Sequence, residues 1–182
     1  MYNEIKTKKI ESDYDIAIPQ SFTNIEGENG VLVLASSGRK TLSGKVSDVS
    51  KIVVSEGTVV FAEGARATSE LVVINGARVE FEEDPALVGF TGLKLGDDTS
   101  SGVLVFAPDK TLAIGGRIDL VHPIVILDGA FPSGSAYTLM TTSESVSEST
   151  EEKWGNVIIA EGINAAKSHK FSVSKGESSA AF

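Results

Sequence analysis

The segment 51–61 reads KIVVSEGTVVF, and the segment 70–81 repeats the same design as ELVVINGARVEF. The glycines Gly57 and Gly76 lie 19 residues apart, and so do Ile52 and Leu71. Beyond the glycine the interval becomes 20 residues, which matches Phe61 with Phe81. An internal period of about 20 residues, built from two short strands around a glycine, is typical of a coil that stacks on copies of itself.

Short runs of β-forming residues, closed by Gly, Asn, Asp or Pro, recur along the whole chain. Within them, large apolar residues alternate at i and i+2, as in Leu71 and Val73, so these side chains would face one core. No window carries the apolar period of a capped amphipathic helix. The predicted strands span residues 30–35, 40–46, 51–55, 58–62, 70–74, 78–82, 92–95, 102–107, 111–114, 117–121, 124–127, 136–141, 156–160 and 170–173.

Two alternatives exist for the glycine turns. The pair Asn75-Gly76 taken alone favours a tight antiparallel hairpin, whereas its place inside a repeat favours the corner of a coil. Segments GVLVL at 30–34 and GVLVF at 102–106 are each followed by Lys-Thr-Leu, and we interpret them as degenerate copies of one unit. The pattern therefore predicts an all-β parallel β-solenoid with five or six coils between residues 30 and 130. The alternative fold is an antiparallel β-sandwich.

The composition limits the partners. The chain has 182 residues, a formal net charge of −9 and no cysteine, and 41% of its residues are hydrophobic. An acidic chain without a basic stripe is unsuited to binding nucleic acid, and no segment is apolar enough to insert into a membrane. The polar N-terminus lacks the apolar region of a signal peptide. We therefore expect no nucleic acid and no membrane insertion, and the composition leaves the oligomeric state open.

Composition shifts suggest four segments. Residues 1–29 are polar and would form an N-terminal cap or a partly disordered segment, and residues 30–141 would form the solenoid body. Residues 142–153 are rich in Ser and Glu and are interpreted as an exposed loop. Residues 154–182 would supply C-terminal strands that close the solenoid, with Trp154 capping the core rather than binding sugar.

The repeat unit resembles the strand repeats of autotransporter-type passenger domains. The resemblance rests on GVLVL at 30–34, KIVVSEGTVVF at 51–61 and the closing segment GAFPSGSAYTLMTT at 129–142, and it covers roughly residues 30–141. It implies a right-handed parallel β-helix of the pectate-lyase-like superfold, at a bacterial cell surface or outside the cell. Because this sequence has no export signal, the chain would then belong to a longer exported protein. The family has no universal catalytic residues to transfer.

Few residues suggest chemistry. Asp97 and Asp98, in the loop Gly-Asp-Asp-Thr-Ser-Ser-Gly, offer oxygen ligands suited to Ca²⁺, the one ion or cofactor that the sequence suggests. The loop matches no known calcium-binding repeat, and a plain turn is the favoured interpretation. Arg78 lies near them in a strand that also carries Glu80 and leads to Glu82. His122, before Pro123, is interpreted as a corner residue, and His169 as exposed.

Three functions remain. The first is a non-enzymatic surface or secreted module for adhesion or structural display, which binds a glycan or a protein. The second is a carbohydrate-active β-helix enzyme, a polysaccharide lyase or hydrolase that would use Asp97, Asp98 and Arg78. The third is a segment of a phage or viral fibre, which would require trimerisation. The repeat and the lack of a catalytic motif favour the first.

Overall fold

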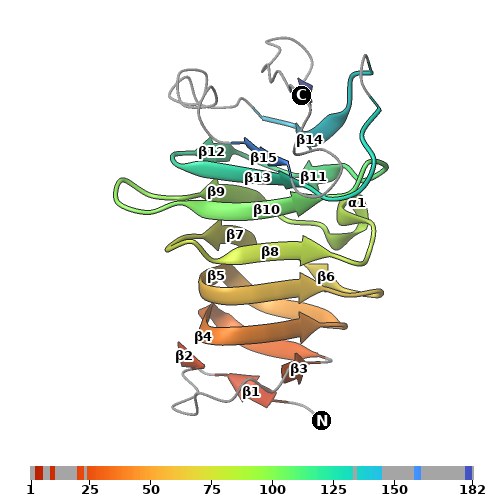
Figure 1. Ribbon diagram of the computed structural model, residues 1–182. Helices are drawn as coiled ribbons and strands as arrows, with labels where there is room; N and C mark the ends of the chain where they lie inside the picture. Colours follow the sequence, from red (N-terminus) through yellow and green to blue (C-terminus); the bar gives the residue numbers. More distant parts are fainter. Residues whose placement is uncertain are drawn as a thin grey trace.

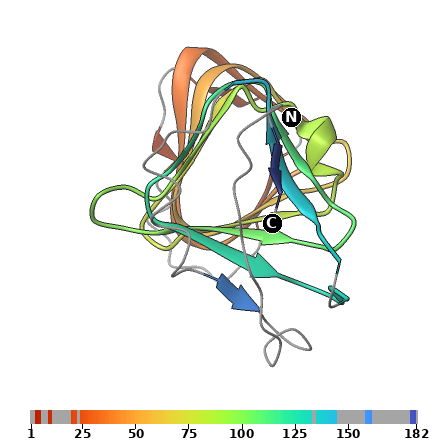
Figure 2. The same ribbon diagram turned by 90° about the horizontal axis from the view of Figure 1, so that it is seen from above.

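The chain winds into a right-handed parallel β-helix of about five turns (Figure 1). The computed structural model describes residues 3–5, 9–10, 20–22, 24–132, 135–144, 158–160 and 179–181. Seen along the axis, each coil is roughly triangular, so the helix has three walls (Figure 2). Nearly all strand pairs are parallel, which confirms the predicted solenoid and shows that the antiparallel sandwich is wrong.

Strands β4 (Ile25–Leu42) and β5 (Lys45–Phe61) each bend around two corners and contribute to all three walls. The first wall also contains β2 (Lys9–Ile10), β7 (Glu70–Val73), β9 (Gly92–Leu95) and β12 (Ile118–Leu120). The second wall also contains β3 (Gln20–Phe22), β8 (Arg78–Phe81), β10 (Gly102–Phe106), β13 (Pro123–Leu127) and β15 (Ile158–Ala160). The third wall also contains β1 (Asn3–Ile5), β6 (Arg66–Ala67), α1 (Pro85–Val88), β11 (Leu112–Ile114), β14 (Thr138–Thr142) and β16 (Ser179–Ala181).

The core is a set of ladders in which one inward side chain lies directly on the next. On the first wall, one ladder consists of Leu32, Ile52, Leu71, Leu93 and Ile118, all of them buried. Each such side chain stabilises the fold by roughly 1.5–3 kcal/mol relative to exposure in water. Because strand side chains alternate between faces, every second residue of each strand enters this core.

The register agrees with the internal repeat residue by residue. Ile52 pairs with Leu71 at an interval of 19, and Phe61 pairs with Phe81 at an interval of 20. The extra residue lies in the corner that contains Gly76, so the change of interval marks a corner that is one residue longer. Gly57 and Gly76 are coil corners and not hairpin turns, because β7 and β8 each pair in parallel with β5 and not with each other. Both glycines have positive φ, 69° and 73°.

Two details of the predicted strands are wrong. The segments 30–34 and 102–106 are not equivalent copies, because the first lies on the first wall and the second on the second wall. Strands of every wall need apolar residues at alternate positions to fill the core, so strands of different walls have similar sequences. The predicted strand 40–46 is also wrong, since residues Ser43 and Gly44 form the corner between β4 and β5.

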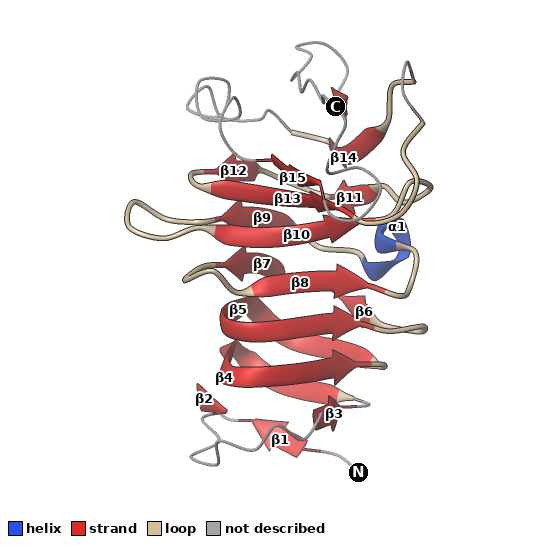
Figure 3. Cartoon of the chain, viewed as in Figure 1, coloured by secondary structure: helices blue, strands red, loops and turns tan. Residues whose placement is uncertain are grey.

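A one-turn helix, α1, replaces a strand on the third wall (Figure 3). The side chain of Asp84 accepts a hydrogen bond from Ala86 N at 3.1 Å, Pro85 opens the helix, and Gly89 ends it with φ of 93°. The sequence does not predict this helix, because a single turn carries no periodic signal. Helix α1 lies against β6 and β11, its neighbours on that wall. In the described ranges, no helix has the length and apolarity needed to cross a membrane.

Lys40 occupies an inward position that a sequence pattern would assign to an apolar residue. It pairs with Val59 in the ladder of the second wall and is 1% exposed. Its Nζ donates hydrogen bonds to the backbone oxygens of Ser36 and Gly38. Burial lowers the pKa of Lys40, and the carboxylate of Glu56 offsets part of that shift. The lysine therefore satisfies carbonyl groups at a corner of the first complete coil.

The ends of the stack lie partly outside the described residues. Strands β1, β2 and β3 pair in parallel with β4, so the segment 1–29 contributes backbone to the stack. The predicted boundaries at residues 30, 142 and 154 remain predictions. The predictions for Trp154, His169, the strand 170–173 and the loop from residue 145 fall outside the described residues.

Candidate functional site

Asp97 organises the corner loop between β9 and β10. Its Oδ1 accepts hydrogen bonds from Thr99 N at 2.8 Å and from Ser100 N at 2.7 Å. The hydroxyls of the same two residues also donate to it, each at 2.9 Å. These donors, first of all the backbone N–H of Thr99, lower the pKa of Asp97 to about 2. The carboxylate is therefore ionised at neutral pH and holds the loop closed.

The calcium interpretation of Asp97 and Asp98 stays a prediction. Asp98 is exposed next to Asp97, but one oxygen of Asp97 already accepts four hydrogen bonds. Calcium takes six to eight oxygen ligands. Among the residues that the structure describes, no group of three or more His, Cys, Asp or Glu residues is placed to hold a metal ion. Ligands from backbone carbonyls and water would have to complete such a site.

His122 lies on the next corner of the stack, as the sequence predicts. Its Nδ1 lies 2.5 Å from the backbone oxygen of Asp97. The corner is tight, because a Cβ on Gly96 would come within 2.6 Å of the backbone oxygen of His122. The histidine thus contacts the main chain of the Asp97 loop, while Asp119, a carboxylate three residues before it in the sequence, forms an ion pair with Arg117.

The charged residues of the second wall form a connected group. Glu80 lies between Arg39 and Arg78, with an N–O distance of 2.7 Å to each, and Arg39 also approaches Glu82 at 3.8 Å. Each exposed pair stabilises the fold by about 0–1 kcal/mol. The group joins β4 to β8, which are two coils apart, and engages Arg78, the residue suggested as a catalytic base.

We expect the Asp97 loop and a second corner to make stability depend on acid pH. Hydrogen bonds from Arg66, from Gly64 N and from Asp84 N lower the pKa of Glu83 from 4.5 to about 2. The pKa of Asp97 is likewise lowered, from 3.8 to about 2. Because both folded pKa values lie below the unfolded ones, the stabilisation is complete above the unfolded values and is lost as pH falls toward 2.

The test is the urea midpoint of unfolding, measured by circular dichroism at a series of pH values from neutral to pH 2. The urea midpoint of the wild type should fall below about pH 4.5. The midpoints of D97N and E83Q should be lower than that of the wild type at neutral pH and should fall less on acidification. D98N, which changes an exposed neighbour, serves as the control. An unchanged pH profile for both D97N and E83Q would contradict this account.

A polar groove lies on the outside of the first wall, around Gly92. Gly92 pairs with Glu70 in the coil before it, and Leu93 N donates to Arg117 O in the coil after it at 3.0 Å. Glu70 and Arg117, the neighbours of Gly92 in the adjacent coils, therefore carry long side chains where Gly92 has none. The groove has a volume of about 460 Å³ and is lined by Ser50, Glu70, Thr91, Gly92, Leu93, Arg117 and Asp119.

Opposite charges meet along the groove. Arg117 NH2 lies 3.6 Å from Asp119 Oδ2, and Lys51 Nζ lies 3.0 Å from Glu70 Oε2. The side chain of Arg117 is 64% exposed, whereas that of Asp119 is 28% exposed. Donors and acceptors of hydrogen bonds are thus both accessible to a ligand. The groove was not predicted from the sequence. Its signal is a glycine at an outward position between charged residues of neighbouring coils, and this can be recognised only once the lengths of those coils are known.

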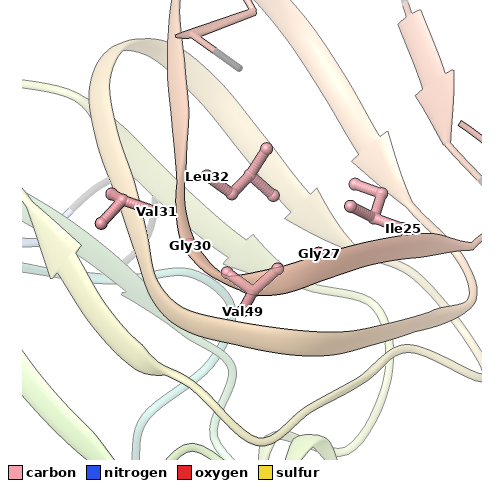
Figure 4. A pocket seen from close by; sticks show the side chains of 6 residues that line it. All are labelled: Ile25, Gly27, Gly30, Val31, Leu32 and Val49. Carbon is pink, nitrogen blue, oxygen red and sulfur yellow. The ribbon is translucent and has the colours of Figure 1, made fainter. Parts of the chain in front are cut away.

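A second hollow, at the corner between the third and first walls, has no such chemistry. It measures about 10 Å³ and is lined by Ile25, Gly27, Gly30, Val31, Leu32 and Val49 (Figure 4). A space of that size holds about one water molecule at most. It results from the glycines at a tight corner, where a Cβ on Gly27 would lie 2.8 Å from the backbone oxygen of Asp48.

No family model matches this chain, and comparison with curated proteins and with solved structures finds no significant match.

Proposed function

We propose that this chain is a non-enzymatic β-solenoid module, displayed on the cell surface or outside the cell, that serves adhesion or structural display. The observation that carries the proposal is the continuous parallel β-helix with outer charges paired from coil to coil, as in Arg39–Glu80 and Lys51–Glu70. Such a stack is a stiff rod whose outer walls present polar side chains. The resemblance of residues 30–141 to passenger-type repeats supports the location.

The charge states of Asp97 and Glu83 favour binding over catalysis at these two carboxylates. A general acid that works near neutral pH needs a raised pKa, whereas the pKa values of Asp97 and Glu83 are lowered to about 2. Glu80 is held by two arginines. We therefore propose a glycan or a protein as the partner, and the net charge of −9 argues against nucleic acid.

A carbohydrate-active enzyme is the second candidate, because the groove around Gly92 places Glu70 and Asp119 on an outer wall, where a polymer has access. Calcium bound at Asp97 and Asp98 belongs to this alternative. A fibre segment is the third, and sedimentation that shows a trimer would favour it.

Two measurements test the proposed function. Antibodies raised against the purified protein should label intact, unpermeabilised cells that express the full-length protein, and labelling that appears only after lysis would overturn the location. Pectate, alginate and hyaluronate, incubated with the protein with and without Ca²⁺, should yield no unsaturated or reducing products. Turnover that D97N abolishes would replace the proposal with the lyase alternative.

A further inference from the structure

The groove around Gly92 crosses four successive coils of the β-helix. Ser50 comes from the coil of β5, Glu70 begins β7, Gly92 begins β9, and Arg117 directly precedes β12. These strands lie one above another in the first wall (Figure 1). With a spacing of about 4.8 Å between strands, the groove extends roughly 14 Å parallel to the helix axis.

Gly92 gives the groove its depth. A Cβ at this position would lie 3.3 Å from Glu70 Cγ and 3.6 Å from Arg117 O, so any larger side chain would extend between these two residues and fill the space. The backbone of Gly92 does not have the positive φ that requires glycine. The local fold therefore accepts other residues once Glu70 Cγ, an atom of a flexible side chain, shifts by a few tenths of an ångström, and the lack of a side chain matters for the surface.

The lining suits a ligand that both donates and accepts hydrogen bonds. Glu70 and Asp119 supply acceptors, Arg117 supplies donors, and the Ser50 hydroxyl, which donates to Gly30 O at 2.9 Å, can still accept. Glu70 is paired with Lys51 and Asp119 with Arg117, so the groove itself is close to neutral. The net charge of −9 on the whole chain still disfavours a polyanion. An apolar peptide would find no hydrophobic anchor, because the inward Leu93 is 1% exposed.

We propose that this groove binds a linear, neutral oligosaccharide that lies parallel to the helix axis. The hydroxyls of successive sugar units would meet successive coils, since the spacing of the strands is comparable to the length of one pyranose unit. None of the described residues that line the groove is aromatic, so binding would depend on hydrogen bonds alone and would be weak. The proposal deepens the adhesive role and rests on it for biological meaning, but not for the binding itself.

The test uses cellotriose, maltotriose and mannotriose as neutral probes and trigalacturonate as an acidic one, titrated into the whole protein by calorimetry or NMR. We expect at least one neutral trisaccharide to bind with a dissociation constant of about 1 mM or below, and trigalacturonate to bind at least about tenfold more weakly. Filling the groove with G92Q, or removing its donor with R117A, should weaken binding by about tenfold or more.

Two variants of the second wall serve as matched controls. T41Q adds a long side chain there, and R39A removes an arginine from an ion pair, so both should bind as the wild type does. Circular dichroism spectra must match for all variants. If none of the neutral trisaccharides binds, or if G92Q binds as well as T41Q, the inference is overturned. Surface labelling of cells is independent of this result. Absence of oligosaccharide binding at the groove can therefore be distinguished from failure of the proposed surface function.

Discussion

F61A should lower the free energy of unfolding by about 3–5 kcal/mol, because it removes a fully buried ring and leaves a cavity in a stack that cannot collapse. Phe61 is 0% exposed. Its ring stacks on Phe81 with a centroid distance of 5.7 Å, and Phe90 meets it edge-on at 5.1 Å. The neighbouring coils are fixed by their own backbone hydrogen bonds, so they cannot move inward to fill the space.

Urea unfolding followed by far-ultraviolet circular dichroism measures this loss. F61L, which keeps most of the volume, should cost less than about 1.5 kcal/mol. L87A serves as the surface control, since Leu87 is 52% exposed, and should stay within about 0.5 kcal/mol of the wild type. A loss for F61A as small as that for L87A would contradict the described packing.

The repeat in the sequence predicts the fold because the architecture imposes it. Parallel strands in register place equivalent inward residues on top of one another, so Ile52 and Leu71 meet the same neighbours and have similar side chains. This is why the two intervals, 19 before the glycine and 20 after it, could be converted directly into strand register.

The same logic explains the errors. Alternation reports that a residue faces the core but not which wall it belongs to, so the segment 102–106 resembles 30–34 although their walls differ. The burial of Lys40 could not be predicted either, since a charged residue in a strand is normally assigned to the surface. Only the fold brings its Nζ beside the carbonyls of Ser36 and Gly38.

Prediction of sites was limited by sequence distance. The loop at Asp97 is local, and its residues could be read from one short segment, although whether it binds calcium stays a prediction. The groove needs Glu70, Gly92 and Arg117 together, and these become neighbours only once the lengths of two unequal coils are known. The insertion of α1 and of the long loop after β9 changes the interval between coils and hides that relationship from the repeat.

G57A and G76A should differ sharply, although both glycines have nearly the same φ, 69° and 73°. Alanine at either position adopts a left-handed conformation that costs about 1 kcal/mol. At Gly76 the new Cβ would meet nothing within 4 Å, so the backbone strain should be the whole loss of stability for G76A. At Gly57 it would lie 2.4 Å from Ser36 O and 2.5 Å from Gly38 O, which no rotation of a side chain can relieve.

The clash at Gly57 falls on a part of the backbone that cannot easily shift. Ser36 O and Gly38 O are the acceptors of the buried Lys40, so moving them would disturb the contacts of that ammonium group. A forced backbone shift of this kind costs about 1–3 kcal/mol in addition to the strain, for a total of about 2–4 kcal/mol. The comparison needs only the difference between two urea midpoints measured under the same conditions. Equal losses for G57A and G76A would mean that the corner of Gly57 does not stack on the corner of Ser36 and Gly38 as closely as described. A larger loss at Gly57 would tie the stability of the solenoid to close backbone contact between successive corners.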